Sequence, residues 1–419
     1  MAGRGAVSKG WLIGPLGAGR GGYSYSTSLL LVVIVLVSAA FATTSCRGDS
    51  GGVYDHLSKN YQVLDLNDLE SFRLMDPYLE LNDLFMAGEL HNIPENMDIE
   101  PALLEHLVLE AGVRYYIPEC QFSSAAFMQI FLETADVSFL ERAYGREIKP
   151  NEPLMRKWRR IQGFWASLPP EKSFQVIGLD VEHSVSVSLD YLSYLISTQS
   201  TRPSDTIAPM LAEIQALSTK EGSSPELVTD FITRFHKDAT WREELYQKFF
   251  GGDYFSFSMV EQNLYNRLEV HAPEELPLML REGMIIENFR SVYFRYPRGK
   301  YFGQWGSFHA WESGFAGQLR DLPKHKLPIG DRVLSITYLY KDCVSYTTGQ
   351  PEPVTDYYGI RGTVIKAFDE LASDARFTLF RLVGEDSPFQ DGPILSLVET
   401  RRPTADFTQF IVVIRGSGG

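Results

Sequence analysis

The sequence predicts an α/β fold with a mainly parallel central sheet flanked by helices and carrying an all-helical insertion. Short β-branched and aromatic runs alternate with amphipathic helical patterns in both halves of the chain. Several of these runs end directly in acidic residues or histidines. From about residue 205 to about residue 290, strand signals disappear and helical spacing dominates. We therefore expect one α/β domain over residues 61–419, with the insertion inside it.

Composition supports a globular domain with an acidic surface. The chain has 419 residues, of which 44% are hydrophobic and 13% aromatic, enough for a large core. The net charge is -14, and the first 45 residues carry three basic residues and no acid, so removing them leaves -17. Such a charge disfavours binding to nucleic acid, and we expect a small-molecule substrate instead.

The N-terminus is predicted to be an export signal. Leu29–Val37 is almost purely aliphatic and falls short of the roughly 20 residues that span a bilayer. Small residues precede Cys46, which resembles the signal of bacterial lipoproteins. We expect residues 1–45 to be removed and Cys46 to be lipidated, with residues 46–60 as a tether. This places the protein in the bacterial cell envelope, anchored to a membrane through the lipid. An uncleaved anchor and plain secretion are the alternatives.

The first predicted strand ends in a candidate site. Leu84–Ala87 is an apolar run of the kind that fills a parallel sheet, and Gly88 marks the turn after it. Glu89 and His91 follow at once. Ligands of α/β sheets lie beyond the carboxyl ends of the strands, so both side chains are candidates for chemistry. The alternative is an N-cap carboxylate and a surface histidine.

Two further strands end in the same way. A helix is expected over Ile99–Ala111, followed by the strand Val113–Ile117, after which comes Glu119. The strand Phe174–Leu179 leads into the cluster Asp180–His183, which contains two acids and a histidine. The order strand, helix, strand predicts a parallel arrangement in which these ends meet.

The remaining elements follow from the same patterns. Further strands are expected at Tyr301–Gly303, Val333–Tyr340, Phe377–Val383 and Phe407–Ile414, and the turn after the first of these ends in His309. Apolar residues at helical spacing predict the helices Ser123–Thr134, Asp136–Trp165, Leu189–Ile196, Met210–Leu217, Leu227–Phe250, Phe255–Leu268, Leu276–Phe289 and Thr363–Leu371.

Carboxylates beside imidazoles support two kinds of chemistry. An imidazole can take a proton from water while a carboxylate fixes its tautomer, or the same groups can hold a divalent metal. The spacing does not choose between them. Glu89 and His91 are too close for a helical HExxH zinc site. The chain shows no GxSxG, GxxxxGK[ST] or strand-linked GxGxxG motif, which counts against common serine hydrolases and nucleotide-binding folds.

Five short motifs occur in an order that resembles a known family. They are Gly88–His91, Glu119 after a strand, Val176–Asp180, Arg281–Asn288 and Gly306–His309. Together they are similar to the erythromycin-esterase-like and ChaN-like superfamily. The resemblance implies an α/β fold with a helical insertion and a cleft built from these residues. Together with the predicted lipoprotein signal, it leads us to expect a lipid-anchored hydrolase of the esterase type.

The resemblance also implies roles for individual residues. His91 would be the general base for water attack on an ester, with Glu89 and Glu119 as its partners. His309 matches the second histidine of the pattern. Three further residues would lie on the substrate side: Arg281, Asn288 and Asp180.

Other functions and structural roles stay open at this stage. A haem- or metal-binding surface lipoprotein without turnover and a metal-dependent peptidase are the alternatives, with Glu89, His91, Glu119 and His309 as candidate metal ligands. An esterase of this type needs no cofactor. Asn92 and Glu282 depart from the family pattern and leave the substrate open. Glu119 can instead cap a helix, and Arg281 can form an ordinary ion pair.

Overall fold

The computed structural model describes residues 50–145, 151–220, 225–270, 277–346, 350–354, 363–395 and 402–416. The chain divides into two units, Met1–Arg47 and Gly48–Gly419, and all described residues belong to the second unit. The expected signal segment and Cys46 lie outside the described residues. Among the described helices, none has both the length and the apolar character needed to cross a membrane.

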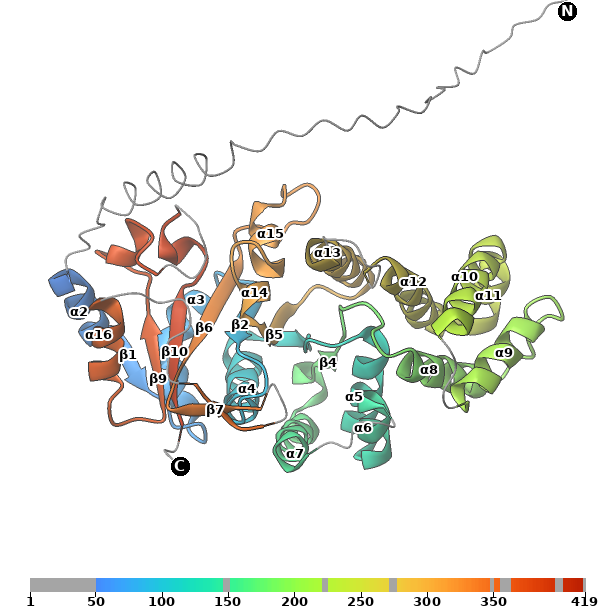
Figure 1. The fold of residues 1–419 in the computed structure, drawn as a ribbon, viewed down its shortest axis with the longest axis horizontal. Coiled ribbons are helices and arrows are strands. Elements are labelled where there is room, and N and C mark those ends of the chain that lie inside the picture. Colours follow the sequence, from blue (N-terminus) through green and yellow to red (C-terminus); the bar gives the residue numbers. More distant parts are fainter. Residues whose placement is uncertain are drawn as a thin grey trace, which may run out of the picture. The chain divides into compact units, whose positions relative to one another are not determined.

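An eight-stranded, mainly parallel sheet forms the centre of the fold and confirms the predicted fold class (Figure 1). The strand order is β1-β9-β10-β6-β2-β5-β3-β4, and only the pairings of β9 with β1 and with β10 are antiparallel. A separate hairpin joins β7 (Cys343–Ser345) to β8 (Glu352–Val354). The strands of the large sheet are β1 (Tyr61–Val63), β2 (Leu84–Glu89), β3 (Val113–Tyr116), β4 (Gln175–Val176), β5 (Lys300–Gly306), β6 (Val333–Lys341), β9 (Phe377–Arg381) and β10 (Phe410–Arg415).

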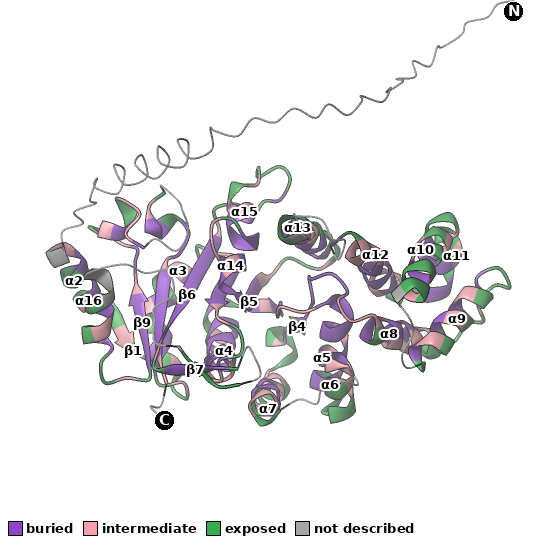
Figure 2. Cartoon of the chain, in the orientation of Figure 1, coloured by how far each residue is buried: buried purple, intermediate pink, exposed green. Residues whose placement is uncertain are grey.

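The middle strands are continuous apolar runs because helices and loops cover both of their faces. β2 lies between β5 and β6, and every residue of β2 except Glu89 is buried. Figure 2 shows β2, β6 and β10 as buried strands, whereas the surrounding helices keep exposed outer faces. Glu89 lies opposite Gly306 in the parallel register. The ends of β2 and β5 therefore meet at one edge of the sheet.

Helices surround this sheet, and most of them fall where the sequence predicts them. The helix after β2 begins at Asn96 rather than Ile99, and its last turn is a π-helix over Leu107–Ala111. Gly112 ends it with φ = 75°, a conformation that favours glycine. The helices outside the insertion are α2 (Ser50–Lys59), α3 (Asp76–Leu79), α4 (Asn96–His106), α5 (Phe122–Thr134), α6 (Val137–Tyr144), α7 (Glu152–Ser167), α8 (Val185–Thr198), α14 (Ser307–Ala310), α15 (Phe315–Asp321) and α16 (Thr363–Leu371).

Among the described residues of the insertion, every regular element is a helix. Figure 1 shows its helices at the β4 end of the sheet, on the far side from α2 and α16. Aromatic side chains pack its interior, and Phe250 stacks on Phe257 with ring centroids 4.4 Å apart. The helices are α9 (Ala208–Ser218), α10 (Pro225–Trp241), α11 (Glu243–Phe250), α12 (Tyr254–Val270) and α13 (Pro277–Arg295).

Two long predicted helices are each divided in two. The pattern over Asp136–Trp165 corresponds to α6 and α7, with residues 146–150 outside the described part of the chain. Pro153 occupies an early position of α7, where the ring is tolerated. The pattern over Leu227–Phe250 is interrupted at Arg242, whose φ and ψ of -122° and 28° are not helical.

The segment predicted to be a tether is partly helical. α2 occupies Ser50–Lys59, and its Val53 and Leu57 are buried in one cluster with Phe368 of α16. The Gly- and Ser-rich composition of this segment gave no indication of a helix. Val53 and Leu57 nevertheless lie four positions apart on one helical face. From Ser50 to Lys59, the segment predicted to be a tether is therefore a helix that packs against α16.

The third predicted strand is much shorter than Phe174–Leu179, because β4 covers only Gln175 and Val176. Beyond β4 the chain runs against the loop after β3, where the Asp180 N–H donates to the Cys120 carbonyl at 3.2 Å. A Cβ on Gly178 would lie 2.2 Å from the Gln121 carbonyl oxygen. Glycine at position 178 thus permits the close approach of two backbones that brings Asp180 beside the end of β3.

Gly178→Ala should destabilise the fold, because its Cβ would meet backbone atoms that cannot rotate away. We expect the free energy of unfolding to fall by about 3 kcal/mol, at the upper end of the usual overpacking cost. Denaturant unfolding monitored by circular dichroism measures it. The matched control is Gly163→Ala on an exposed face of α7, where no atom lies within 4 Å of the new Cβ. That change should be neutral or raise stability by up to about 1 kcal/mol. Equal stability of the two variants would contradict this account.

Candidate active site

The ends of three adjacent parallel strands carry the candidate site. Glu89 ends β2, Gly306 ends β5, and Glu119 follows β3 two residues after Ile117. The sheet places β5 between β2 and β3. Glu119 Oε2 accepts a hydrogen bond from the Gly306 N–H at 2.7 Å, so the carboxylate bridges two strand ends. The predicted convergence of side chains at this edge is present in the structure.

Glu89 and His91 form a hydrogen-bonded pair. Glu89 Oε1 lies 2.6 Å from His91 Nδ1. Since the carboxylate is an acceptor, Nδ1 carries the proton and Nε2 is left as the basic nitrogen. The hydrogen bond that His91 donates to Glu89 raises the pKa of His91, and burial opposes that shift. The His91 side chain is 57% exposed, whereas Glu89 is 11% exposed. The pair is therefore anchored at its acid and open to solvent at its imidazole.

A buried amide and a phenol hold this pair in place. Asn96, at the start of α4, donates from Nδ2 to Glu89 Oε2 and to the Leu90 carbonyl. Tyr340, near the end of β6, donates to Asn96 Oδ1 at 2.8 Å and accepts from the Leu90 N–H at 3.1 Å. Both side chains are buried, so these hydrogen bonds fix the turn that carries His91. Neither Asn96 nor Tyr340 was predicted from the sequence as part of the site.

Glu119 is the electrostatic centre of the site. Its Oε1 lies 3.0 Å from Arg281 Nη2 and 3.2 Å from His309 Nε2, and its Oε2 lies 3.8 Å from His91 Nε2. Burial alone would raise the pKa of Glu119, but the hydrogen bond from His309 and its positive charge lower it to about 2. Glu119 is thus an anion at neutral pH and is not a proton donor.

His309 is held as a cation between two carboxylates. Its Nε2 faces Glu119 and its Nδ1 lies 2.6 Å from Glu282 Oε1. Burial lowers the pKa of His309, but the two acids outweigh it and raise the pKa to about 9. Glu282 is fully buried, so its charge is compensated by the imidazolium. His309 is therefore protonated at pH 7 and cannot serve as a general base.

Arg281 and Asp180 form a buried ion pair next to Glu119. Arg281 donates from Nε to Asp180 Oδ1 at 2.9 Å and from Nη2 to Asp180 Oδ2. His183 Nε2 also lies 3.0 Å from Asp180 Oδ2. Burial opposes ionisation of Asp180, yet the hydrogen bonds from His183 and Arg281 hold its pKa below the usual range. Asp180 is 2% exposed, so its role is to position Arg281 and it does not face a substrate.

Two other predicted residues support the scaffold. Asn288 donates to the Leu179 carbonyl at 2.8 Å and exchanges hydrogen bonds with Asn263 of α12. This amide ties α13 to α12 and to the chain before Asp180, and its place on the substrate side stays a prediction. Glu182 is fully buried and accepts hydrogen bonds from Ser123 and Ser188. Burial raises the pKa of Glu182 to about 7.

Gly306 keeps the basic nitrogen accessible. A Cβ at this position would lie 2.9 Å from His91 Nε2 and 3.6 Å from Glu119 Oε2. Any larger residue would therefore cover the nitrogen that can accept a proton. The sequence offered no signal for this role beyond a glycine at the end of a strand.

The candidate metal ligands do not form a metal site. Among the described residues, no group of three or more His, Cys, Asp and Glu side chains is arranged to hold an ion. The chemistry of the donors explains this, because His309 is protonated between two acids and Glu119 binds Arg281 and the Gly306 N–H. Among the four candidate ligands, His91 alone has a half-exposed side chain. These residues do not fit a bound metal.

Solved structures share this fold. No family model and no curated protein matches the chain. A protein from Bacillus cereus aligns with a TM-score of 0.63 at 12% identity, covering 87% of this chain and 97% of that one. A succinoglycan biosynthesis protein aligns with a TM-score of 0.65 at 16% identity, covering 88% and 98%. A mutant of the erythromycin esterase EreC in its open conformation aligns with a TM-score of 0.59 at 12% identity, covering 86% and 99%.

These structural similarities establish the fold and do not show the activity. The predicted resemblance to erythromycin esterases is confirmed at the level of fold. A haem-binding ChaN protein of Campylobacter jejuni also matches at 11% identity, but its TM-score of 0.29 is too low to infer a shared function.

The ion pair of His309 with its two acids makes stability depend on pH. The folded pKa of about 9 lies above the ordinary value of 6.5, so the imidazolium stabilises the fold fully below pH 6.5. We expect about 3 kcal/mol of unfolding free energy to be lost as the pH rises from 6.5 through 9. Urea unfolding at a series of pH values measures the slope.

Glu282→Gln should flatten this slope, because one of the two acids that raise the pKa is removed. Glu287→Gln is the control, since Glu287 lies on the same helix with a side chain 68% exposed and paired with Arg290. A slope that stays unchanged in Glu282→Gln would show that His309 is not the group responsible.

Proposed function

We propose that this chain, which has the fold of a solved erythromycin esterase, is a hydrolase that uses His91 to activate water for attack on an ester. One observation carries the proposal. A half-exposed imidazole has its Nδ1 fixed by a carboxylate that is only 11% exposed, while its Nε2 lies next to Gly306, which has no side chain to cover it. This is the arrangement that a general base needs.

The proposed reaction requires only groups that the chain supplies. His91 Nε2 takes a proton from water as the oxygen attacks the carbonyl carbon, and Glu89 stabilises the imidazolium that forms. The carbonyl π electrons move onto oxygen and return when the C–O bond to the alcohol breaks. His91 then gives its proton to the leaving alkoxide. The products are a carboxylic acid and an alcohol, and His91 is again neutral.

Arg281 is the group best suited to the developing oxyanion. It is positively charged, and its side chain is 20% exposed at the edge of the cluster. Its Nε and Nη2 atoms bind Asp180 and Glu119, and these hydrogen bonds with described residues do not use Nη1. A guanidinium that is already fixed by two acids needs little reorganisation in the transition state.

Exposed apolar side chains next to the cluster favour esters with an apolar body. Leu278 and Met279 are 44% and 48% exposed and precede Arg281 on α13. At helical spacing they lie on the face that carries Arg281 and Glu282. On the side of His91, Tyr346 is 49% exposed and its N–H donates to the Asn92 carbonyl. A substrate panel should therefore include aliphatic and macrocyclic esters.

The envelope location remains a proposal based on residues 29–46. We propose that the protein is exported and lipidated at Cys46, because an aliphatic run and small residues precede that cysteine. Intact-mass spectrometry of the membrane fraction tests it. Cys46→Ala should release the protein from the membrane and remove the mass of the lipid, and an unchanged mass would contradict lipidation.

His91→Ala should abolish ester hydrolysis without unfolding the protein. Loss of a general base lowers kcat/KM by about 100- to 10,000-fold. The measurement is a spectrophotometric screen of 4-nitrophenyl esters together with chromatographic detection of lactone opening. His325→Ala is the matched control, because His325 is an exposed histidine outside the cluster.

The pH profile separates catalysis from structural damage. The pKa of His91 is raised above 6.5, and a general base must be deprotonated. In the native protein, kcat/KM should therefore rise as the pH increases through the raised pKa of His91. Glu89→Gln removes the hydrogen-bonded acid and should move this limb to lower pH. Full activity of His91→Ala, with unchanged thermal unfolding, would refute the proposal.

A further inference from the structure

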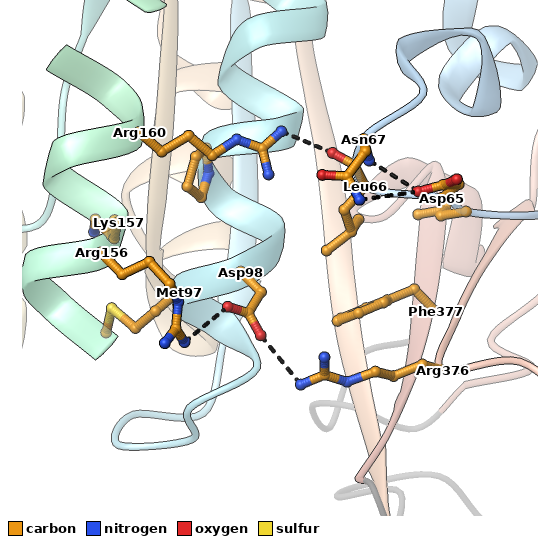
Figure 3. Close-up of a pocket in the computed structure, with 12 residues that line it drawn as sticks. Asp65, Leu66, Asn67, Met97, Asp98, Arg156, Lys157, Arg160, Arg376 and Phe377 are labelled. Atoms are coloured by element: carbon orange, nitrogen blue, oxygen red, sulfur yellow. Dashed lines mark hydrogen bonds and ion pairs between the residues drawn. The ribbon is translucent and has the colours of Figure 1, made fainter. Parts of the chain in front are cut away.

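A second cavity lies apart from the cluster of His91, Glu119 and His309. It has a volume of about 720 Å³ and opens between the loop Leu64–Asn67, helices α4 and α7, and the start of β9. None of its lining residues belongs to that cluster. Figure 3 shows α7 on one wall and the residues at the start of β9 on the other, with α4 between them. We call it the cationic cavity.

The lining of the cationic cavity is basic although the protein is acidic. Four basic side chains line it, against two acids, in a chain of net charge -14. The basic residues are Arg156, Lys157, Arg160 and Arg376. Among the side chains that line the cavity, positive charges outnumber negative ones by four to two, and Glu95, Glu100 and Glu105 outside the lining pair with Arg376, Lys157 and Arg160.

Lys157 and Arg160 are committed to structural contacts. Lys157 is buried and its ammonium binds Glu100. Arg160 donates from Nε and Nη2 to Glu105 at 2.8 and 2.7 Å, and Nη2 also donates to the Leu66 carbonyl at 2.7 Å. Arg160 therefore joins α7 to the loop that closes one end of the cavity. These two cations shape the walls.

Arg156 and Arg376 reach across the cavity toward one shared acid. Arg156 Nη2 lies 3.2 Å from Asp98 Oδ1, and Arg376 Nη2 lies 3.1 Å from Asp98 Oδ2. The two guanidinium groups come from opposite walls and meet at this carboxylate (Figure 3). Their side chains are 57% and 46% exposed. Arg376 has a second acid, Glu95, at 3.6 Å.

Both arginines keep hydrogen-bonding capacity. A guanidinium has five N–H donors, and the contacts with Asp98 use one nitrogen of each side chain. Exposed ion pairs contribute little to stability, so an incoming anion can exchange with Asp98 at small cost. A carboxylate or phosphate group has the planar or tetrahedral set of oxygens that two guanidinium groups bind well.

The rest of the lining adds an apolar surface. Leu66, Met97, Pro101 and Phe377 line the cavity together with the charged groups. Figure 3 shows Met97 and Phe377 beside the Arg156–Asp98–Arg376 contacts. An occupant that uses the whole cavity therefore has an oxyanion at one end and an apolar body at the other.

We propose that the cationic cavity binds a small amphiphilic anion, with its carboxylate or phosphate group between Arg156 and Arg376 and its apolar body against Met97 and Phe377. The Asp98 carboxylate occupies the position that the oxyanion of the ligand takes. Binding is therefore a competition between the ligand and Asp98 for the two arginines. The site is independent of the proposed hydrolase activity.

Isothermal titration calorimetry on the purified native domain tests this proposal. The probes are octanoate and octyl phosphate, which share a chain and differ in the oxyanion, and octylammonium, which carries the opposite charge. Octanoate, octyl phosphate or both should bind, and octylammonium should not. The anion that binds more tightly identifies the preferred oxyanion group. Affinity should fall as sodium chloride is raised, because the attraction is electrostatic and the arginines are exposed.

Three variants separate specific binding from general charge. The double change Arg156→Gln with Arg376→Gln should weaken binding at least about ten-fold, since both charge-assisted contacts are lost. Asp98→Asn should strengthen it several-fold, because the competing carboxylate is neutralised. Arg159→Gln should change affinity less than about two-fold, since exposed charges outside the contact contribute little. Arg159 lies on the same helix with a side chain 59% exposed and pairs with Glu152.

The opposite results would overturn the proposal. One such result is that neither anion gives a heat of binding, either with the native protein or with Asp98→Asn. Another is that the double variant binds the anions with the same affinity as the native protein. Equal binding of octylammonium would also overturn it, because it would show association through the chain alone. Thermal unfolding of each variant confirms that it is folded before titration.

Discussion

The site depends on one carboxylate, Glu119, whose side chain is 16% exposed and which lies at the boundary between two parallel strands. It accepts the Gly306 N–H, and it faces a guanidinium and two imidazoles. A buried anion is tolerated only when its charge is compensated. Arg281 and His309 provide that compensation, and each of them is fixed in turn by a second acid, Asp180 or Glu282. The cluster is therefore one charge network in which each ion holds the next.

This network assigns different roles to two histidines that look alike in the sequence. His309 lies between Glu119 and Glu282, and the two acids raise its pKa to about 9. His91 has a carboxylate at Nδ1 at 2.6 Å, while Glu119 stands 3.8 Å from its other nitrogen. Because His91 is half exposed, it can exchange a proton with water near neutrality. The environment of each ring, rather than its motif, distinguishes the proposed base His91 from the cation His309.

Local sequence patterns predicted the residues at the ends of the strands, but they did not predict the residues that hold those side chains in place. The apolar run before Glu89 and the strand before Glu119 predicted the edge of the sheet at which the two acids meet. Tyr340 was missed because its contact with Asn96 joins residues 244 positions apart, which no local spacing encodes, and Asn96 was missed although it follows Glu89 by only seven positions. Asn288 shares a helix with Arg281, but its amide reaches Leu179 and Asn263 instead. Sequence spacing predicts which face of a helix a residue occupies, and only tertiary packing decides what that face contacts.

The first turn of α4 serves the proposed catalytic site and the cationic cavity on opposite sides. Asn96 points to Glu89, whereas Asp98, two residues later, meets Arg156 and Arg376. Successive residues of an α-helix are about 100° apart, so a separation of two residues places side chains on nearly opposite faces. Asn96 is fully buried and Asp98 is partly exposed. An anion can therefore exchange with the surface ion pairs of Asp98 while the buried hydrogen bonds that position Glu89 and His91 remain in place.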